Sequence, residues 1–352
     1  MIRGLDEKLM REAQERLDCL TKPQGSLGRL EDLAKQIVGI TGKENPSLKN
    51  KVIFTLAADH GVTEEGISAY PKEVTAQMVY NFIRGGAGIN VLAKHIGARV
   101  VVADIGVAEK IQIQKTKIKN KINGSKFQDK KIAFGTKNMA KGPAMRKDDA
   151  KKAIETGMEI FEEEFINGID IIGTGEMGIG NTTAASAITA CFTGKPVEEL
   201  TGRGTGLDDN ALQHKISVIK KALETNRPDP DDAMDVLAKV GGFEIAGLVG
   251  IILAAAARRI PVVIDGFISG AAALAAFHLE PKSKDYMIAS HCSVEVGHKS
   301  ILQHIGLVPL LDLNLRLGEG TGSCLGINLA EAAIKILTRM ATFKSAKVSE
   351  KT

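Results

Sequence analysis

The sequence is poor in aromatic residues: tryptophan is absent, and Phe, Tyr and Trp together make up 4% of its 352 residues. Its core must therefore be aliphatic and rich in alanine. The four cysteines, Cys19, Cys191, Cys292 and Cys324, have neither metal-ligand spacing nor the pattern of a disulfide framework. The longest apolar region, residues 245–257, is too short to span a bilayer, and the charged N-terminus is unlike a signal peptide. We expect a cytoplasmic protein with no membrane partner.

The sequence also lacks a large excess of charge of either sign. The formal net charge is only +4, too small to indicate a nucleic-acid partner. Residues 110–131 hold eight lysines, and residues 111–122 alternate apolar residues with mostly basic ones. This period of two is typical of a half-buried edge strand or hairpin whose lysine face prevents edge-to-edge pairing. A nucleic-acid-binding arm is the alternative, but no aromatic residue is interleaved within 111–122.

Short apolar runs alternate with helical patterns along most of the chain. We predict buried strands, of the kind found in parallel sheets, over residues 52–57, 99–104, 168–173, 260–265 and 306–313. We predict helices over residues 6–20, 27–41, 73–83, 87–96, 148–164, 182–191, 208–223, 231–239, 243–258, 268–278 and 327–340. This alternation predicts an α/β fold with a doubly wound, mainly parallel sheet.

The first two helices and the last one lie outside the alternation of strands and helices. We therefore expect residues 1–45 and 327–352 to form a small helical lobe, with a frayed C-terminal tail. Residues 46–326 would then form the α/β domain.

A glycine-rich segment, residues 171–188, runs from an apolar strand through four glycines into an alanine-rich helix. The free N–H groups and the dipole at the start of such a helix favour an anion, and glycine lets the backbone approach a phosphate closely. Asn181, Thr182 and Thr183 supply further donors. A tight turn without a ligand is the alternative, although four glycines and three polar residues exceed what a turn requires.

The same segment matches a dinucleotide fingerprint in part. Gly173, Gly175 and Gly178 spell G-x-G-x-x-G, so an NAD-linked oxidoreductase is an alternative function. The match is incomplete, because no second apolar strand ending in an acidic residue follows about twenty positions later. A Walker A loop is excluded, since no Gly-Lys-Ser/Thr follows the glycines.

Glu176 is unexpected in a segment that favours an anion. A carboxylate beside a phosphate is repelled by ~1 kcal/mol or more, depending on the local dielectric. It would be tolerated beside a positive charge, such as the C1′ atom of a ribose that develops oxocarbenium character while a base leaves. This argument points to a phosphorylated riboside as the substrate, with its phosphate on the backbone amides.

Two other glycine clusters support a phosphate and sugar site. Small residues at 201–209 precede a helix, and Lys215 lies about two helical turns inside it, either within reach of a phosphate or on the solvated surface. Glu319 is a second isolated carboxylate, flanked by Gly318 and Gly320 before a helix rich in small residues. We expect the segment around Glu319 to be a site loop rather than a surface turn.

Other polar residues are candidates for functional roles. Asp59 and His60 follow a predicted strand and form either an acid–base pair or, as we favour, a hydrogen-bonded structural pair. His291, Cys292, His298 and His304 have no recognised zinc spacing, so we expect no metal. Asp265 ends a predicted buried strand, where α/β sites gather, and is a candidate for orienting ribose or ligand loops.

Ten stretches between about residues 15 and 341 closely resemble, in order, the nicotinate-nucleotide–dimethylbenzimidazole phosphoribosyltransferase family. They are LTKPQGSLGRLEDLA, AADHGVTEEGISAYPKEVTAQMV, GGAGINVLA, FGTKNMAKGPAM, IGTGEMGIGNTTAASAI, TGRGTGLDD, VGGFEIAGLVG, IPVVIDGFISGAAAL, ASHCSVEVGHKSIL and LLDLNLRLGEGTGSCLGINLAEAAIKI. The resemblance implies a Rossmann-like sheet with a small helical lobe, and a homodimer. It also implies transfer of 5-phosphoribose from nicotinate mononucleotide to 5,6-dimethylbenzimidazole or a related base. The products would be α-ribazole 5′-phosphate and nicotinate, in cobalamin biosynthesis, without a cofactor or metal.

The resemblance assigns roles residue by residue. Glu319 would be the general base, and Glu176 would lie beside the ribose. The phosphate and ribose would be bound by Gly175, Gly178, Ile179, Gly180, Asn181, Thr182, Gly204 and Lys215. The base would contact Ala69, Tyr70, Gln77 and Leu317. Some family members carry serine at the position of Ala69, which leaves the preferred base open.

Overall fold

A computed structural model describes residues 1–112, 125–204 and 206–349. Its sheet has six strands in the order β3-β2-β1-β4-β5-β6, and every pair of neighbours is parallel. This is the strand order of the doubly wound fold and confirms the predicted fold class. The strands are β1 Lys51–Ala58, β2 Arg99–Gly106, β3 Ser125–Asp129, β4 Ile171–Met177, β5 Val262–Ile264 and β6 Met287–Ala289.

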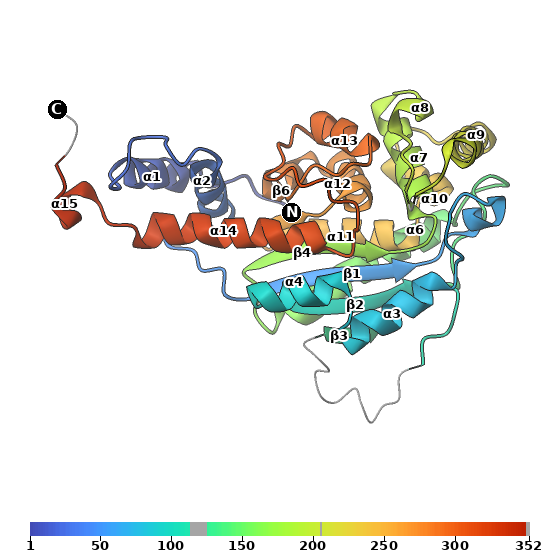
Figure 1. Ribbon diagram of the computed structural model, residues 1–352, viewed down its shortest axis with the longest axis horizontal. Helices are drawn as coiled ribbons and strands as arrows, with labels where there is room; N and C mark the ends of the chain where they lie inside the picture. The colour runs from blue at the N-terminus through green and yellow to red at the C-terminus, as the bar shows by residue number, and fades with distance from the viewer. Residues whose placement is uncertain (113–124, 205, 350–352) are drawn as a thin grey trace.

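Helices cover both faces of the sheet (Figure 1). One layer contains α6 Lys147–Phe165, α7 Asn181–Thr193, α9 Asp209–Asn226, α10 Ala233–Val240, α11 Phe243–Ala257, α12 Phe267–Leu279 and α13 Gly297–Ile305. The other contains α2 Arg29–Thr41, α3 Val74–Arg84, α4 Gly88–Ile96 and α14 Thr321–Arg339. The remaining helical elements are α1 Glu7–Asp18, η1 Gly61–Glu65, α8 Val197–Leu200, η2 Pro281–Tyr286 and α15 Phe343–Ala346.

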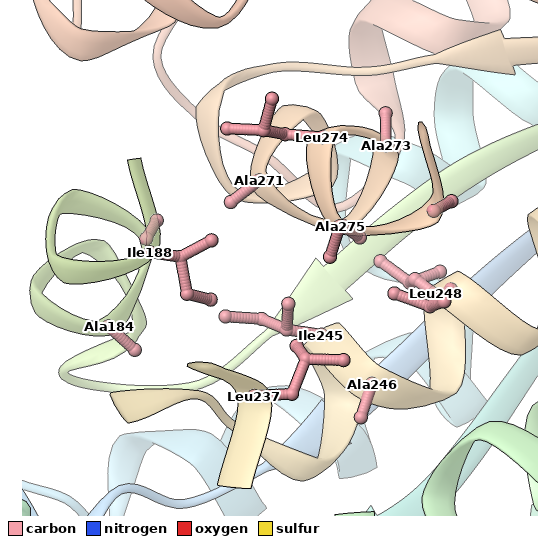
Figure 2. Close-up of a cluster of buried hydrophobic side chains, with 14 of the residues drawn as sticks. Ala184, Ile188, Leu237, Ile245, Ala246, Leu248, Ala271, Ala273, Leu274 and Ala275 are labelled. Atoms are coloured by element: carbon pink, nitrogen blue, oxygen red, sulfur yellow. The ribbon is translucent and has the colours of Figure 1, made fainter. Parts of the chain in front are cut away.

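The core lies on both sides of the sheet, because a strand points successive side chains to opposite faces. In β1, Phe54 and Leu56 pack into one apolar cluster, whereas Ile53 and Ala57 pack into the other. Figure 2 shows part of the first cluster, where helices α7, α10, α11 and α12 meet through alanine, leucine and isoleucine side chains. The aliphatic core expected from the scarcity of aromatic residues is confirmed.

The N-terminal helices lie beside the long C-terminal helix α14 (Figure 1). Helices α1 and α2 pack together, α2 packs on α14, and an antiparallel bridge joins Leu20 to Thr342. The last long helix begins at Thr321, six residues before the predicted start at 327. Among the described helices, none is both long and apolar enough to cross a bilayer.

Three predicted strands need correction or comment. Residues 306–313 form no strand beyond one bridge, between Leu311 and His291, and Pro309 lacks the N–H that a ladder needs. The strand predicted at 168–173 is β4, Ile171–Met177, so Glu176 lies within the sheet. Of the lysine-rich segment 111–122, all but its first two residues lie outside the described residues; the edge strand observed near it is β3.

Candidate active site

A cleft of 480 Å³ opens at the carboxyl ends of β1 and β4. The chain continues from β1 toward one edge of the sheet and from β4 toward the other, so this is the topological switch point where α/β folds bind ligands. The predicted site residues that line the cleft are Tyr70, Glu176, Gly178, Ile179, Asn181, Thr182, Gly204, Leu317 and Glu319. A mononucleotide-sized ligand fits a cleft of this volume.

The glycine turn that follows β4 leads into α7, which begins at Asn181. Gly180 precedes the helix with φ of 94°, a conformation that favours glycine, and no side chain caps the helix. The N–H of Ile179 donates to Thr75 Oγ1 at 3.1 Å. Among the described residues, the N–H groups of Gly180 and Thr182 have no acceptor. These two amides are therefore the donors available to an anion at the helix N-terminus.

Lys215 reaches this helix terminus from α9. The side chain is buried, and its Nζ lies 2.8 Å from Thr182 Oγ1. Burial lowers the pKa of Lys215 to about 8, against a smaller opposing effect of Glu295. The alternative of a solvated surface lysine is wrong. A buried ammonium whose nearest partner is a hydroxyl favours the binding of an anion beside it.

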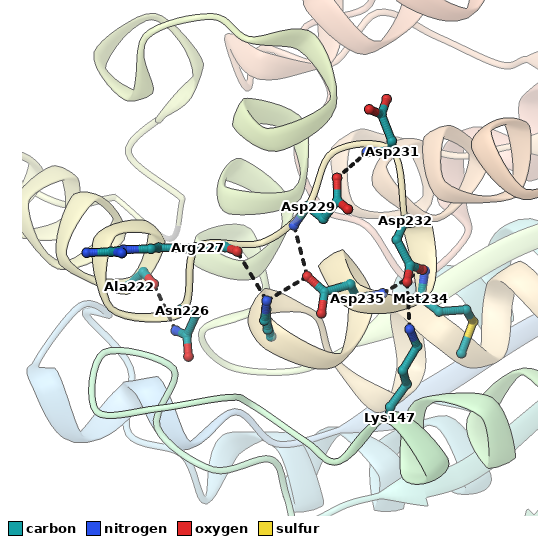
Figure 3. A network of polar contacts seen from close by, with 10 residues as sticks. Lys147, Ala222, Asn226, Arg227, Asp229, Asp231, Asp232, Met234 and Asp235 are labelled. Atoms are coloured by element: carbon teal, nitrogen blue, oxygen red, sulfur yellow. Dashed lines mark hydrogen bonds and ion pairs between the residues drawn. The ribbon is translucent and has the colours of Figure 1, made fainter.

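A polar network fixes the connection from α9 to α10 (Figure 3). Asp232 caps α10 by accepting hydrogen bonds from the N–H groups of Met234 and Asp235, and Lys147 Nζ lies 2.6 Å from Asp232 Oδ2. The N–H of Asp229 donates to Asp235 at 2.9 Å. The helix that carries Lys215 is thereby held at its far end as well as at the cleft.

Glu176 lies in β4, opposite Leu56 of β1. Its side chain is buried, and Asn181 Nδ2 donates a hydrogen bond to Oε2. Burial, and then the nearby charges of Glu244 and Asp265, raise the pKa of Glu176 to about 8. A pKa of about 8 favours the protonated carboxyl at neutral pH, and a positive group beside Glu176 would favour its ionised form.

Glu319 has a left-handed backbone conformation, with φ of 63°, between Gly318 and Gly320. Such conformations are strained for residues other than glycine and are common at functional sites. The N–H of Ile89, in the first turn of α4, donates to Glu319 Oε2 at 3.0 Å, and Thr55 Oγ1 donates to the Glu319 carbonyl at 2.9 Å. Burial raises the pKa of Glu319, which suits a general base.

Asp265 holds the loop that carries Glu319. Its two carboxylate oxygens accept hydrogen bonds from the N–H groups of Gly320 and Ser323, at 3.1 and 3.0 Å. Burial raises the pKa of Asp265 to about 7, although these backbone donors oppose the shift. Asp265 thus ties the Glu319 loop and the first turn of α14 to the end of β5.

Glycines bring the two acidic residues together. A β-carbon at Gly175 would lie 2.2 Å from the carbonyl oxygen of Glu319, and one at Gly318 would lie 2.3 Å from Glu176 Oε1. Neither distance is possible for real atoms, so a side chain at either position would separate the two segments. Gly175 within β4 and Gly318 beside Glu319 therefore allow the Glu319 loop to pack closely against β4.

One wall of the cleft is apolar, formed by Tyr70, Val74, Met78, Met177 and Leu317. Tyr70 is 54% exposed and Leu317 is 60% exposed, so this wall has surface left to cover with a ligand.

Five predicted site residues do not line this cleft. Gly175 lies in β4, and Gly180 is the N-cap of α7. Lys215 contacts Thr182, which does line the cleft. Ala69 lines a neighbouring cavity that shares Tyr70, and Gln77 is exposed on α3.

Sequence reasoning gave no role to several residues that line the cleft, namely Gly266, Phe267, Ile268, His291, Ser293, Glu295 and Arg316. Most follow the carboxyl ends of β5 and β6. The three-residue strand β6 was not predicted, and without it His291 and Ser293 could not be assigned to the same edge of the sheet. Among the described residues, no group of three or more His, Cys, Asp or Glu side chains could hold a metal ion.

Known proteins are similar to this chain along nearly its whole length. A family model described as "Phosphoribosyltransferase" matches residues 2–348. Nicotinate-nucleotide–dimethylbenzimidazole phosphoribosyltransferase of Desulforudis audaxviator is 59% identical over 98% of this chain and 95% of its own length. The enzyme of that name from Geobacter sulfurreducens is 56% identical over 98% and 96%. The crystal structure of CobT from Thermus thermophilus superposes with a TM-score of 0.91 at 41% identity, covering 98% of this chain and all of that one.

The similarity spans nearly the whole chain, and it does not support the alternative of an NAD-linked oxidoreductase. The chain belongs to the nicotinate-nucleotide–dimethylbenzimidazole phosphoribosyltransferase family.

Proposed function

We propose that this protein transfers 5-phosphoribose from nicotinate mononucleotide to 5,6-dimethylbenzimidazole or a related base. The observation that carries the proposal is the meeting of Glu176 and Glu319 in one cleft, next to a helix N-terminus with free amides and a buried lysine. The products are α-ribazole 5′-phosphate and nicotinate, as the resemblance of the sequence to this family implies.

The phosphate is bound at the start of α7. The free N–H groups of Gly180 and Thr182, the side chain of Asn181 and the Lys215 ammonium support this assignment. Together with the helix dipole they favour a dianion over a neutral group. The ribose then extends from this end of the cleft toward Glu176.

The incoming base packs on the apolar wall that contains Val74, Met78 and Leu317. Glu319 accepts the proton from one ring nitrogen of the benzimidazole, and the lone pair of the other nitrogen attacks C1′. The bond from C1′ to the pyridinium nitrogen breaks, its electron pair stays on that nitrogen, and nicotinate leaves with a neutral ring nitrogen. Attack from the face opposite the leaving group converts a β-riboside into an α-riboside.

Glu176 stabilises the positive charge that develops on the sugar. The pyridinium of the bound nucleotide is itself a cation, and its approach favours the ionised form of Glu176 over the protonated form. Because the leaving group is already cationic, the reaction needs no metal to assist its departure. Positioning and charge stabilisation supply most of the acceleration.

The proposal includes a cytoplasmic homodimer. The exposed apolar side chains of Val308 and Leu313, in one segment near the cleft, support a covered surface there. Light scattering of the purified protein measures its mass in solution, and a monomer at micromolar concentration would contradict this part of the proposal.

The test of the activity is to incubate the protein with nicotinate mononucleotide and a panel of benzimidazoles, purines and phenols, and to identify products by mass. We expect nicotinate and one α-riboside phosphate in equal amounts, with the preferred base revealed by the largest yield. Release of nicotinate without a base-dependent product, or no reaction with any base, would contradict the proposal.

A further inference from the structure

A buried histidine–glutamate pair packs against the glycine turn that follows β4. His60 follows β1, and Glu244 lies in the first turn of α11; His60 Nε2 and Glu244 Oε1 are 2.7 Å apart. The side chains are 2% and 0% exposed. A β-carbon at Gly178 would lie 3.4 Å from His60 Cδ2 and 3.5 Å from Glu244 Oε1, so the pair is in contact with the turn.

The pair leaves one negative charge poorly compensated unless the imidazole carries a proton. Glu244 Oε2 is buried and has no hydrogen-bond partner among the described residues, which makes His60 the group that can offset this carboxylate. A buried carboxylate without a positive partner is costly. An unpaired Glu244 carboxylate would also repel a phosphate bound at the glycine turn and the ionised form of Glu176.

The surroundings of His60 favour its protonated form. Burial by itself disfavours the charged ring, but the charge of Glu244, the hydrogen bond to it and the charge of Asp59 together raise the pKa of His60 above its ordinary value. The favoured hydrogen-bonded pair of Asp59 and His60 is wrong: Asp59 Oδ2 accepts a hydrogen bond from the N–H of Ala108 at 2.7 Å, and Asp59 Oδ1 has no partner among the described residues.

Glu176 is surrounded by acids from several elements. Glu244 on α11, Asp265 after β5 and Glu319 before α14 all raise the pKa of Glu176, after burial, and Glu244 contributes most of the three. Asn181 on α7 is the neutral donor that opposes them. Neutralising the charge of Glu244 therefore changes the pKa of Glu176 more than neutralising Asp265 or Glu319 would.

We infer that His60 is a positioning residue: as an imidazolium it neutralises Glu244, and it thereby lets Glu176 ionise and lets the glycine turn accept a doubly charged phosphate. The inference rests on the proposed function, in which Glu176 must be ionised during transfer. His60 does not contact the sugar or the base in this assignment; it acts through Glu244.

The test compares wild type, His60→Gln, Glu244→Gln and the double variant, using the pH dependence of kcat/KM for nicotinate mononucleotide. Glutamine at position 60 keeps a donor for Glu244 but carries no charge. We expect His60→Gln to move the acidic limb of the profile upward by about one pH unit, with a roughly tenfold loss on that limb. Glu244→Gln should move the limb downward, and the double variant should return it to the wild-type position or below.

A structural role alone would give a different result. If His60→Gln lowers kcat/KM equally at every pH, or if the double variant is no better than His60→Gln, the inference is wrong. Should His60→Gln fail to fold, Glu244→Gln alone decides: an acidic limb that does not move down overturns the inference. His95→Gln, at an exposed position on α4, is the matched control and should leave the profile unchanged.

Failure of the proposed function has its own signature. A wild-type protein that makes no α-riboside phosphate contradicts the function. If Glu176→Gln keeps the wild-type acidic limb, Glu176 does not have its proposed role. The pH profiles of the His60 and Glu244 variants, in contrast, test only the inference about His60.

Discussion

The Nζ atom of Lys215 lies 2.8 Å from Thr182 Oγ1, at the N-terminus of α7 and out of contact with bulk solvent. In the proposed function this ammonium contacts the phosphate, so an apolar replacement removes a charge-assisted contact worth about 1.5–3 kcal/mol. We expect Lys215→Met to raise KM for nicotinate mononucleotide by about 10- to 150-fold, with a smaller change in kcat.

The matched control for Lys215 is Lys221→Met, at an exposed position on the same helix. It should leave KM unchanged. Steady-state kinetics over a range of nucleotide concentrations measures both variants. An unchanged KM in Lys215→Met would remove this lysine from the phosphate site.

Glu319 is the proposed general base, and glutamine is nearly its isostere. We expect Glu319→Gln to lower kcat by about 10²- to 10⁴-fold, the usual range for a lost general base, while nucleotide binding changes little. Product formation measured by chromatography, together with calorimetric titration of nucleotide, separates the two effects. Wild-type turnover in this variant would contradict the assignment.

The pH dependence of kcat/KM should be a narrow bell in the wild type. Glu176 must lose its proton and Lys215 must keep its proton, and burial brings the pKa of each to about 8. The acidic limb therefore belongs to Glu176 and the alkaline limb to Lys215. Lys215→Arg, whose charge persists at every accessible pH, should extend activity on the alkaline side.

Glu176 also links stability to pH. Its pKa is raised from 4.5 in the unfolded chain to about 8 in the fold, so the folded state holds the extra proton. This contribution is fully present below pH 4.5 and is lost as pH rises through 8, by at most about 1.4 kcal/mol per pH unit. Chemical denaturation of the ligand-free protein should show Glu176→Gln gaining stability relative to wild type between about pH 5 and 8. A constant difference across that range would contradict the raised pKa.

Gly175 tests the contact between β4 and the Glu319 loop. Alanine there would place a β-carbon 2.2 Å from the Glu319 carbonyl oxygen, so the loop must move. We expect Gly175→Ala to cost about 1–3 kcal/mol of unfolding free energy and most of the activity. Gly142→Ala, where a β-carbon has no neighbour within 4 Å, should change neither.

The order of the elements was predictable because hydrophobic period and glycine position are local properties. The runs that became β1, β2, β4 and β5 are apolar on both faces, as strands covered by two helical layers must be. Strand β6, Met287–Ala289, is too short to stand out from the helical residues before it. Residues 306–313 are apolar enough for a strand, but Pro309 interrupts the possible ladder.

The site was predictable only in part, for a related reason. Glu176 and Glu319 were identifiable as isolated carboxylates among glycines, and the family motifs assigned roles to them. The partners of these residues depend on tertiary contacts that no spacing encodes: Asp265 with the amides of Gly320 and Ser323, or His60 with Glu244, 184 positions later in the chain. The burial of Lys215 likewise arises from the packing of α9 against α7.

Helices α6 and α11 touch backbone to backbone: a β-carbon at Gly157 would lie 1.9 Å from the Gly247 carbonyl oxygen, and one at Gly250 would lie 1.9 Å from that of Ile154. With no side chains between them, these helices have nothing to repack, so neither can slide past the other. The start of α11, which carries Glu244, is immobilised by this contact. Under the proposed function, adaptation to bases of different shape would therefore occur at the exposed wall around Tyr70 and Leu317, while the phosphate site at the start of α7 stays unchanged.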